Sequence, residues 1–328
     1  MNKYKCIVYE DEVSFEEIKS ARNRVRFGLC CICNCIRKNK KTEIFCSRTI
    51  TRERFTVEKA IELSIKNCND IVKILEWNEK NNIKLFRLTS NLFPHFTDQK
   101  TEEYNIDFAR DILKKAGELA NKLGHRITTH PGQYCQVGAK DKEILKSTIH
   151  DLDHHADILD TMNIDSNGII CVHGGGVYGD KELTKKRWIE QFQQLPERVK
   201  RRLAIENCEK SYSLRDCLDI AKATGIPVIF DTHHYNCYSI LHPLEKQELP
   251  EDLLPEIIDS WKGRIPLFHV SDQKPNSIIG SHHDYVQYIP GYLLQIPYRF
   301  NIPLHIEIEA KAKEDAVLKL MKRYNFLF

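Results

Sequence analysis

Eight histidine and acidic side chains stand at, or just beyond, the ends of short apolar runs in this chain. Imidazole and carboxylate groups bind divalent transition metals, and several of them around two or three ions form the active sites of multi-metal hydrolases. One such residue after each of several strands is how a parallel barrel directs many donors toward one point. We therefore predict one metal centre, in which the first three residues are also catalytic: Glu206, His130, His173, Asp231, His234, His269, His282 and Glu309.

The apolar runs have the length of buried strands, and the segments between most of them have helical periodicity. Alternating strands and helices without a long linker indicate the α/β class and a single (β/α)8 TIM barrel at residues 25–328, after a short N-terminal extension at 1–24. A doubly wound open sheet is the alternative, but it would gather ligands at one switch point rather than from six strands. The predicted strands are 26–31, 83–90, 125–131, 168–173, 203–206, 226–231, 265–270 and 303–309.

Bulk composition is that of an ordinary globular enzyme, with 41% hydrophobic and 29% charged residues in 328. A net charge of +3 is too small to indicate nucleic-acid binding by itself. The chain has no apolar stretch of about 20 residues and no signal-peptide core, so we expect a soluble, intracellular protein that is not secreted, with no membrane partner and no obligate protein partner. Its 12 cysteines are then expected to be free thiols. The cluster from Cys30 to Cys35 is too tightly spaced for paired zinc knuckles.

Several predicted ligands have a competitor or a second interpretation. Glu206 follows apolar residues on a buried strand, where a carboxylate requires a metal ion or, alternatively, an ion pair with arginine or lysine. His233 competes with His234, and His283 competes with His282. On the last strand, Glu309 is favoured over Glu307 because it is nearer the carboxyl end, where barrel chemistry takes place.

Two further features point to a phosphate-bearing partner. The run HGGGVYGDK (173–181) has glycines that allow close backbone approach, and it ends in Lys181, which could reach a phosphate. Residues 37–54 hold seven basic and two acidic side chains, and a loop after the first strand would lie on the active-site face. The predicted DNA contacts in this segment are Arg37, Lys38, Lys40 and Lys41.

Several separate motifs in one order resemble the UV damage endonuclease family, whose barrel is related to that of endonuclease IV. The resemblance extends from about Arg26 to about Lys319. The motifs are RFG (26–28), FRLTSNLFP (86–94), HPGQY (130–134), HGGGVYGDK (173–181), EN (206–207), FDTHH (230–234), FHVSDQ (268–273), SHHDY (281–285) and IEAKAK (308–313).

This resemblance implies up to three metal ions, most often manganese, with zinc or magnesium as further possibilities. It implies that His130 and His173 bind one ion, that Glu206 bridges it to a second ion completed by Asp231, His269 and Glu309, and that His234 and His282 bind a third. It also implies that Gln133 and Tyr134 probe the damaged strand of double-stranded DNA.

The sequence departs from the family at two positions. Many relatives have a lysine two residues before the strand-seven histidine, where it can help to bind the third ion, but here the residue is Leu267. The family also often has a tyrosine after the first-strand glycine, where this chain has Leu29.

The resulting expectation is metal-dependent hydrolysis of the phosphodiester immediately 5′ to a UV photoproduct or other lesion, which initiates excision repair. The alternatives are an apurinic-site endonuclease without photoproduct preference, a metal-dependent sugar isomerase on a similar barrel, and a DNA-binding module that holds metal without cleaving.

Overall fold

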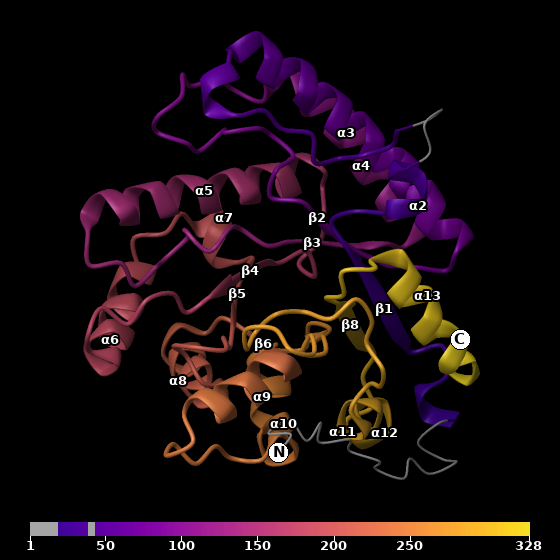
Figure 1. The fold of residues 1–328 in the computed structure, drawn as a ribbon, viewed down its shortest axis with the longest axis vertical. Helices are drawn as coiled ribbons and strands as arrows, with labels where there is room; N and C mark the ends of the chain where they lie inside the picture. The colour runs from indigo at the N-terminus through magenta and orange to yellow at the C-terminus, as the bar shows by residue number, and fades with distance from the viewer. Residues whose placement is uncertain (1–18, 39–42) are drawn as a thin grey trace.

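Eight parallel strands form a closed barrel in chain order, in a computed structural model that describes residues 19–38 and 43–328 (Figure 1). β1 pairs with β2 on one side and with β8 on the other, which closes the sheet. The predicted (β/α)8 barrel is therefore confirmed. The strands are β1 (Val25–Cys30), β2 (Leu85–Leu88), β3 (Arg126–Thr129), β4 (Ile170–His173), β5 (Leu203–Glu206), β6 (Val228–Asp231), β7 (Leu267–Val270) and β8 (Leu304–Ile308).

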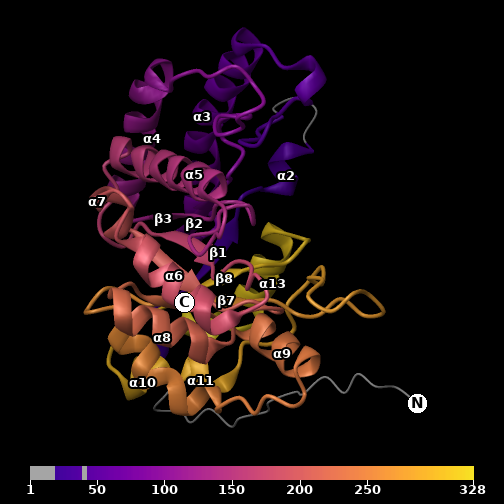
Figure 2. The ribbon, with the colours of Figure 1, turned by 90° about the vertical axis from the view of Figure 1, so that its left-hand side faces the viewer.

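Helices surround the strands in both views of the molecule (Figures 1 and 2). The α-helices are α2 (Asn34–Arg37), α3 (Val57–Lys80), α4 (Arg110–Leu123), α5 (Lys142–Thr161), α6 (Lys181–Phe192), α7 (Glu197–Lys200), α8 (Leu214–Thr224), α9 (Thr232–Leu241), α10 (Pro250–Ser260), α11 (Gly291–Leu294), α12 (Ile296–Arg299) and α13 (Glu314–Arg323). The short 3₁₀ helices are η1 (Arg52–Arg54), η2 (Asp107–Ala109) and η3 (Asn325–Leu327).

Helix and strand ends follow local chemistry. Gly124 and Gly225 end α4 and α8 with φ of 67° and 80°, a left-handed conformation that glycine adopts without a steric penalty. Ser213 and Asp216 form a reciprocal capping box at the start of α8. The first strand was predicted to reach Cys31, but Cys31 has φ of 67° and leaves the strand, so β1 ends at Cys30.

Alternation along the strands divides the core into two parts. Residues that face the helices, such as Phe86, Phe230 and Phe268, belong to one large apolar cluster. Residues that face the barrel axis form a separate, smaller cluster: Leu85, Ile169, Cys171, Ala204, Ile229 and Leu267, with Trp261 below them.

The inner apolar cluster forms a floor beneath a polar layer. Ala204, Ile229 and Leu267 each lie two residues before a residue with a metal-binding side chain on the same strand, and residues two apart share a face. The polar residues of β5, β6 and β7 are therefore held at the carboxyl mouth of the barrel, above a closed apolar base. Among the described ranges, no helix is long and apolar enough to cross a bilayer. The N-terminal extension predicted at 1–24 lies mainly outside those ranges.

Candidate metal centre

Glu206, the last residue of β5, is fully buried at the barrel mouth and has histidines on both sides of its carboxylate. Its Oε2 lies 3.1 Å from His130 Nε2 and 3.1 Å from His173 Nε2. Its Oε1 lies 2.8 Å from His269 Nδ1 and 3.5 Å from His234 Nδ1. One carboxylate therefore presents a separate oxygen to each of two histidine pairs, which is the arrangement of a bridging carboxylate.

The remaining predicted ligands join the same cluster. Glu309 Oε1 lies 3.3 Å from His269 Nδ1, and its Oε2 lies 3.6 Å from His282 Nδ1. Asp231, Glu206 and His269 each offer a ligand atom within 4.8 Å of the others. The structure thus brings together all eight residues that the sequence pattern singled out, from β4 to β7, from the first turn of α9 and from the segments that follow β3, β7 and β8.

Three of the imidazoles have a ring nitrogen held by a main-chain carbonyl oxygen. His130 Nδ1 donates to the Pro131 carbonyl at 2.9 Å, so its Nε2 carries a lone pair toward Glu206 when the ring is neutral. His234 Nδ1 and His282 Nδ1 lie 3.0 Å and 2.9 Å from the carbonyls of Asn207 and Glu309. An outer partner that fixes the tautomer in this way is typical of metal-binding histidines.

Protonated imidazoles and the guanidinium of Arg87 balance the carboxylates of the cluster. Burial would raise the pKa of Glu206, but the adjacent His269 and His173 hold it well below its ordinary value. Burial would lower the pKa of His234, but Asp231 and Glu206 raise it to about 9. His234 and His269, whose pKa values are both raised, therefore hold protons that a divalent cation would displace.

The surroundings of one carboxylate, that of Asp231, indicate whether the site suits a metal ion. Asp231 is fully buried, and its Oδ1 accepts the His234 N–H at 2.7 Å as the N-cap of α9. Its Oδ2 has no hydrogen-bond partner among the described residues. An unpartnered buried carboxylate oxygen beside histidine nitrogens is costly unless it faces a cation, so the donor set fits a divalent ion.

Three residues support the centre that sequence reasoning did not assign to it. Glu307 Oε2 lies 3.0 Å from His269 Nε2, which directs the other ring nitrogen toward Glu206. Arg87 of β2 forms ion pairs with Glu307 and Glu309, and Cys171 donates to Glu206 Oε2 at 3.0 Å. Two-residue alternation along β2, β4 and β8 is the signal that places all three on the inner face.

Leu267 lies two residues before His269 on β7 and is fully buried in the inner apolar cluster. It belongs to the floor of the site and has no atom that could coordinate an ion. Any third ion near His234 and His282 must therefore be bound without a donor from this position.

The glycine run after β4 packs closely against the following loop. A Cβ on Gly174 would come within 2.4 Å of the Tyr212 ring, so only glycine fits there. A cavity of about 200 Å³ opens beside the centre, with the predicted DNA probe Gln133 in its wall. Tyr134 is 83% exposed beyond it. Other residues that line the cavity include His130, His173, Gly175 and Lys210.

Lys181 does not line this cavity. Its Nζ lies 3.0 Å from Asp216 Oδ2 and 2.9 Å from the Tyr238 hydroxyl, and it borders a second cavity together with Glu245. Its charge is compensated within the protein, which does not favour the predicted contact with a DNA phosphate.

Part of the positive charge of the basic segment, residues 37–54, is compensated by ion pairs in the same way. Arg48 pairs with Asp70 at 2.8 Å, and Arg52 pairs with Asp98 at 2.5 Å. Arg37 and Lys38 are exposed and have no ion pair with any described residue, while Lys40 and Lys41 lie outside the described ranges. The positive surface that the structure describes here is smaller than the residue count indicates.

Comparison with known proteins identifies the family. The family model described as UV-endonuclease UvdE matches residues 25–327. The chain belongs to this family. The recognition made from its motifs, and the expectation of a DNA repair endonuclease, are thus confirmed.

Individual relatives agree with this membership. A candidate UV-damage endonuclease of Acanthamoeba polyphaga mimivirus is 34% identical over 314 residues, which cover 92% of each chain. The UV-damage endonuclease of Schizosaccharomyces pombe is 34% identical over 316 residues, which cover 92% of this chain but 51% of the yeast protein. The crystal structure of SacUVDE superposes with a TM-score of 0.78 at 32% identity, covering 92% of this chain and 100% of that one.

Proposed function

We propose that this chain hydrolyses the phosphodiester bond immediately 5′ to a UV photoproduct or other lesion in double-stranded DNA, using two or three divalent ions. The observation that carries the proposal is the convergence of eight donors around Glu206, with the buried Asp231 Oδ2 left without a hydrogen-bond partner. Ions at such a centre would supply Lewis acidity toward phosphate oxygens and a more acidic water, and manganese is the ion we expect there.

The residues of the chain divide between holding that centre and holding the substrate. His130 and His173 lie at the open side of Glu206 and also line the cavity, so they lie where a phosphate would meet the centre. Asp231 and His269 lie on the enclosed side and are fully buried. We assign the first ion to His130, His173 and Glu206, the second to Glu206, Asp231, His269 and Glu309, and a third to His234 and His282.

The loop after β3 has exposed side chains that could select damaged over undamaged DNA. Gln133 and Tyr134 are exposed immediately beyond the ligand His130, on the side of the cavity. A damaged base pair costs less to unstack than an intact one, so side chains that occupy the vacated space select the lesion through deformability. We propose that Gln133 enters that space and that Tyr134 stacks on a neighbouring base.

The test is a strand-nicking assay on a duplex with one photoproduct and a label at one end. The wild-type chain with manganese should cut at the 5′ side of the lesion and leave an undamaged duplex intact. Cutting on the 3′ side, equal cutting of both duplexes, or cutting undiminished by exhaustive chelation would contradict the proposal. A duplex with one abasic site separates the alternatives: strong preference for it would indicate an apurinic-site endonuclease instead.

A further inference from the structure

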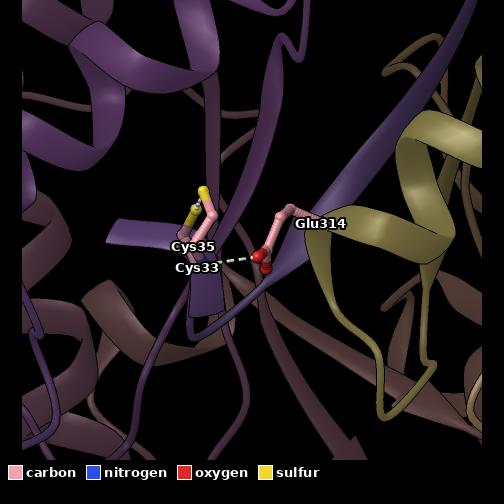
Figure 3. A group of neighbouring side chains, drawn as sticks. All are labelled: Cys33, Cys35 and Glu314. Carbon is pink, nitrogen blue, oxygen red and sulfur yellow. Dashed lines mark hydrogen bonds between the residues drawn. The ribbon is translucent and has the colours of Figure 1, made fainter. Parts of the chain in front are cut away.

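Two thiols of the cysteine-rich stretch after β1 face each other at the base of the basic segment. Cys33 Sγ and Cys35 Sγ are 3.4 Å apart (Figure 3). The other cysteines of this stretch point elsewhere: Cys46 donates to the Cys31 carbonyl at 3.2 Å, and Cys30 lies inside the barrel beside Glu307 and Glu309. The cysteines in the described ranges are all free thiols.

A carboxylate from the far end of the chain completes the group. Glu314, the first residue of α13, extends toward the cysteine pair and meets its backbone (Figure 3). Its Oε1 accepts the Cys35 N–H at 2.6 Å and its Oε2 accepts the Asn34 N–H at 2.7 Å, which fixes the carboxylate and leaves each oxygen a second lone pair. Ligand atoms of Cys33, Cys35 and Glu314 all lie within 4.8 Å of one another.

The charge of this group is uncompensated. Glu314 is 1% exposed and forms no ion pair with any residue in the described ranges. A buried carboxylate usually has a cationic partner because desolvation is expensive. Burial, together with the charge of Glu314, raises the pKa of the Cys33 thiol.

The backbone conformation of Lys313, just before Glu314, supports a functional role for Glu314. Lys313 has φ of 55° and ψ of −121°, an unfavourable conformation for a residue with a side chain. Strained residues of this kind persist where the surroundings fix them and are concentrated at functional sites. Here the unusual turn leads directly into the residue that faces the thiols.

We propose that Cys33, Cys35 and Glu314 bind a thiophilic divalent cation of the zinc class, separate from the Glu206-centred site. Two thiolates and one carboxylate supply three of four tetrahedral positions, and the exposed side, where Cys35 lies, leaves the fourth to water. Binding releases the two thiol protons to solvent. The ion ties the turn after β1 to the helix after β8 and so fixes the base of the segment with Arg37 and Lys38.

The spectroscopic test uses Co²⁺ alone as probe on the full chain, kept reduced with a phosphine. Thiolate ligands should give a sulfur-to-cobalt charge-transfer band in the near ultraviolet, which imidazole and carboxylate do not give. The band should disappear in the double variant Cys33→Ser/Cys35→Ser and persist in the control Cys31→Ser, whose thiol lies outside the group. A band that survives in the double variant would come from another thiol, such as Cys171, and would overturn the proposal.

A second measurement needs no cysteine variant. Zinc in excess of what the Glu206-centred site can bind should protect Cys35 of the wild-type chain from alkylation, as read by peptide mass, and Glu314→Gln should weaken that protection by at least about tenfold in zinc concentration. Alkylation at an unchanged rate with zinc present, or a Cys33–Cys35 disulfide that forms in place of a metal complex, would refute the site. Neither readout involves nicking, so the outcome is independent of the proposed endonuclease activity.

Discussion

Two groups of buried charges lie on this barrel, and they differ in what neutralises them. Around Glu206 the carboxylates meet imidazoles and one thiol, which can release a proton and offer a lone pair, and only Glu307 and Glu309 also meet a permanent cation, Arg87. Around Asp216 the carboxylate meets Lys181 and Lys185, whose Nζ atoms lie 3.0 Å and 3.1 Å away. An ammonium group has donors only, so the second group is complete without any further ion.

The contrast shows how the proposed metal centre differs from a structural ion-pair network. Both groups are buried, and both lower the pKa of a carboxylate. Only the Glu206 group has a carboxylate oxygen, Asp231 Oδ2, with no hydrogen-bond donor among the described residues. The partners of a carboxylate, rather than its burial or its pKa, therefore indicate which group awaits a cation.

The largest expected effect is at Glu206. Glu206→Gln keeps the shape of the side chain but removes the charge that both histidine pairs face. We expect nicking of photoproduct-containing DNA to fall by at least about 10³-fold, because several kcal/mol of transition-state stabilisation depend on the ions. The matched control Asp216→Asn, an equivalent change in the other group, should nick within about threefold of wild type when both are folded. Equal loss in the two variants would show that the contrast has no functional meaning.

Asp231→Asn should separate metal binding from folding. The amide can still accept the His234 N–H, while the unpartnered charge is removed. The metal-free variant should therefore melt at the same temperature as the metal-free wild type, or higher, and should lose the stabilisation that manganese gives the wild type. Calorimetry should show manganese affinity lower by at least about 100-fold, a larger loss than changes behind the ligands cause. A metal-free variant that melts lower than wild type would contradict the interpretation of Oδ2.

Glu307→Gln tests the residue behind His269. The variant keeps a hydrogen-bonding group 3.0 Å from His269 Nε2 but no longer holds that nitrogen with a charge. Changes of this kind cost about 10- to 100-fold in metal affinity or activity. Nicking rates measured across a manganese titration should recover partly at high manganese. A rate that is low and does not respond to manganese would place Glu307 outside the metal centre.

The smallest effect is on stability, at Asp216. Asp216→Asn should lower the free energy of unfolding at pH 7 by about 1–3 kcal/mol, because a partly buried charge pair loses one partner. Burial raises the pKa of Asp216, but Lys181 and a hydrogen bond from Ser213 bring it below its ordinary 3.8. A lowered folded-state pKa gives stability that is present above the unfolded pKa and is lost as the pH falls through the folded one. Urea unfolding of the two proteins should therefore converge below about pH 4. A gap that stays constant into acid would refute the charge assignment.

The sequence was sufficient for the barrel and for the residues that cluster around Glu206, because both rest on local patterns, while the role of these residues as metal ligands stays a prediction. An apolar run that ends in a donor specifies a strand and its functional end together, and this holds for His173, Glu206 and Asp231. The strand limits were less certain, since the positive φ at Cys31 has no signature in the apolar pattern.

The sequence did not reveal which charged residues are already paired, because their partners lie far away in the chain. Lys181 pairs with Asp216, and Arg48 pairs with Asp70. Only the fold determines that these residues meet. Arg87 was part of a motif, yet its role depends on β2 and β8 lying close enough for it to reach Glu309. A local pattern shows which groups can bind a charge, but tertiary structure decides which of them already have one.

The eight candidate donors come from β4 to β7, from the first turn of α9 and from the segments that follow β3, β7 and β8, while the loops after β1 and β2 contribute none. The proposed metal centre and the loops after β1 and β2 are therefore built from separate parts of the chain. Insertions after β1 or β2 can vary in length and charge without displacing an imidazole, which leaves these two loops free to diversify. Grafting them from one relative to another offers a way to exchange substrate range while the cleavage reaction stays the same.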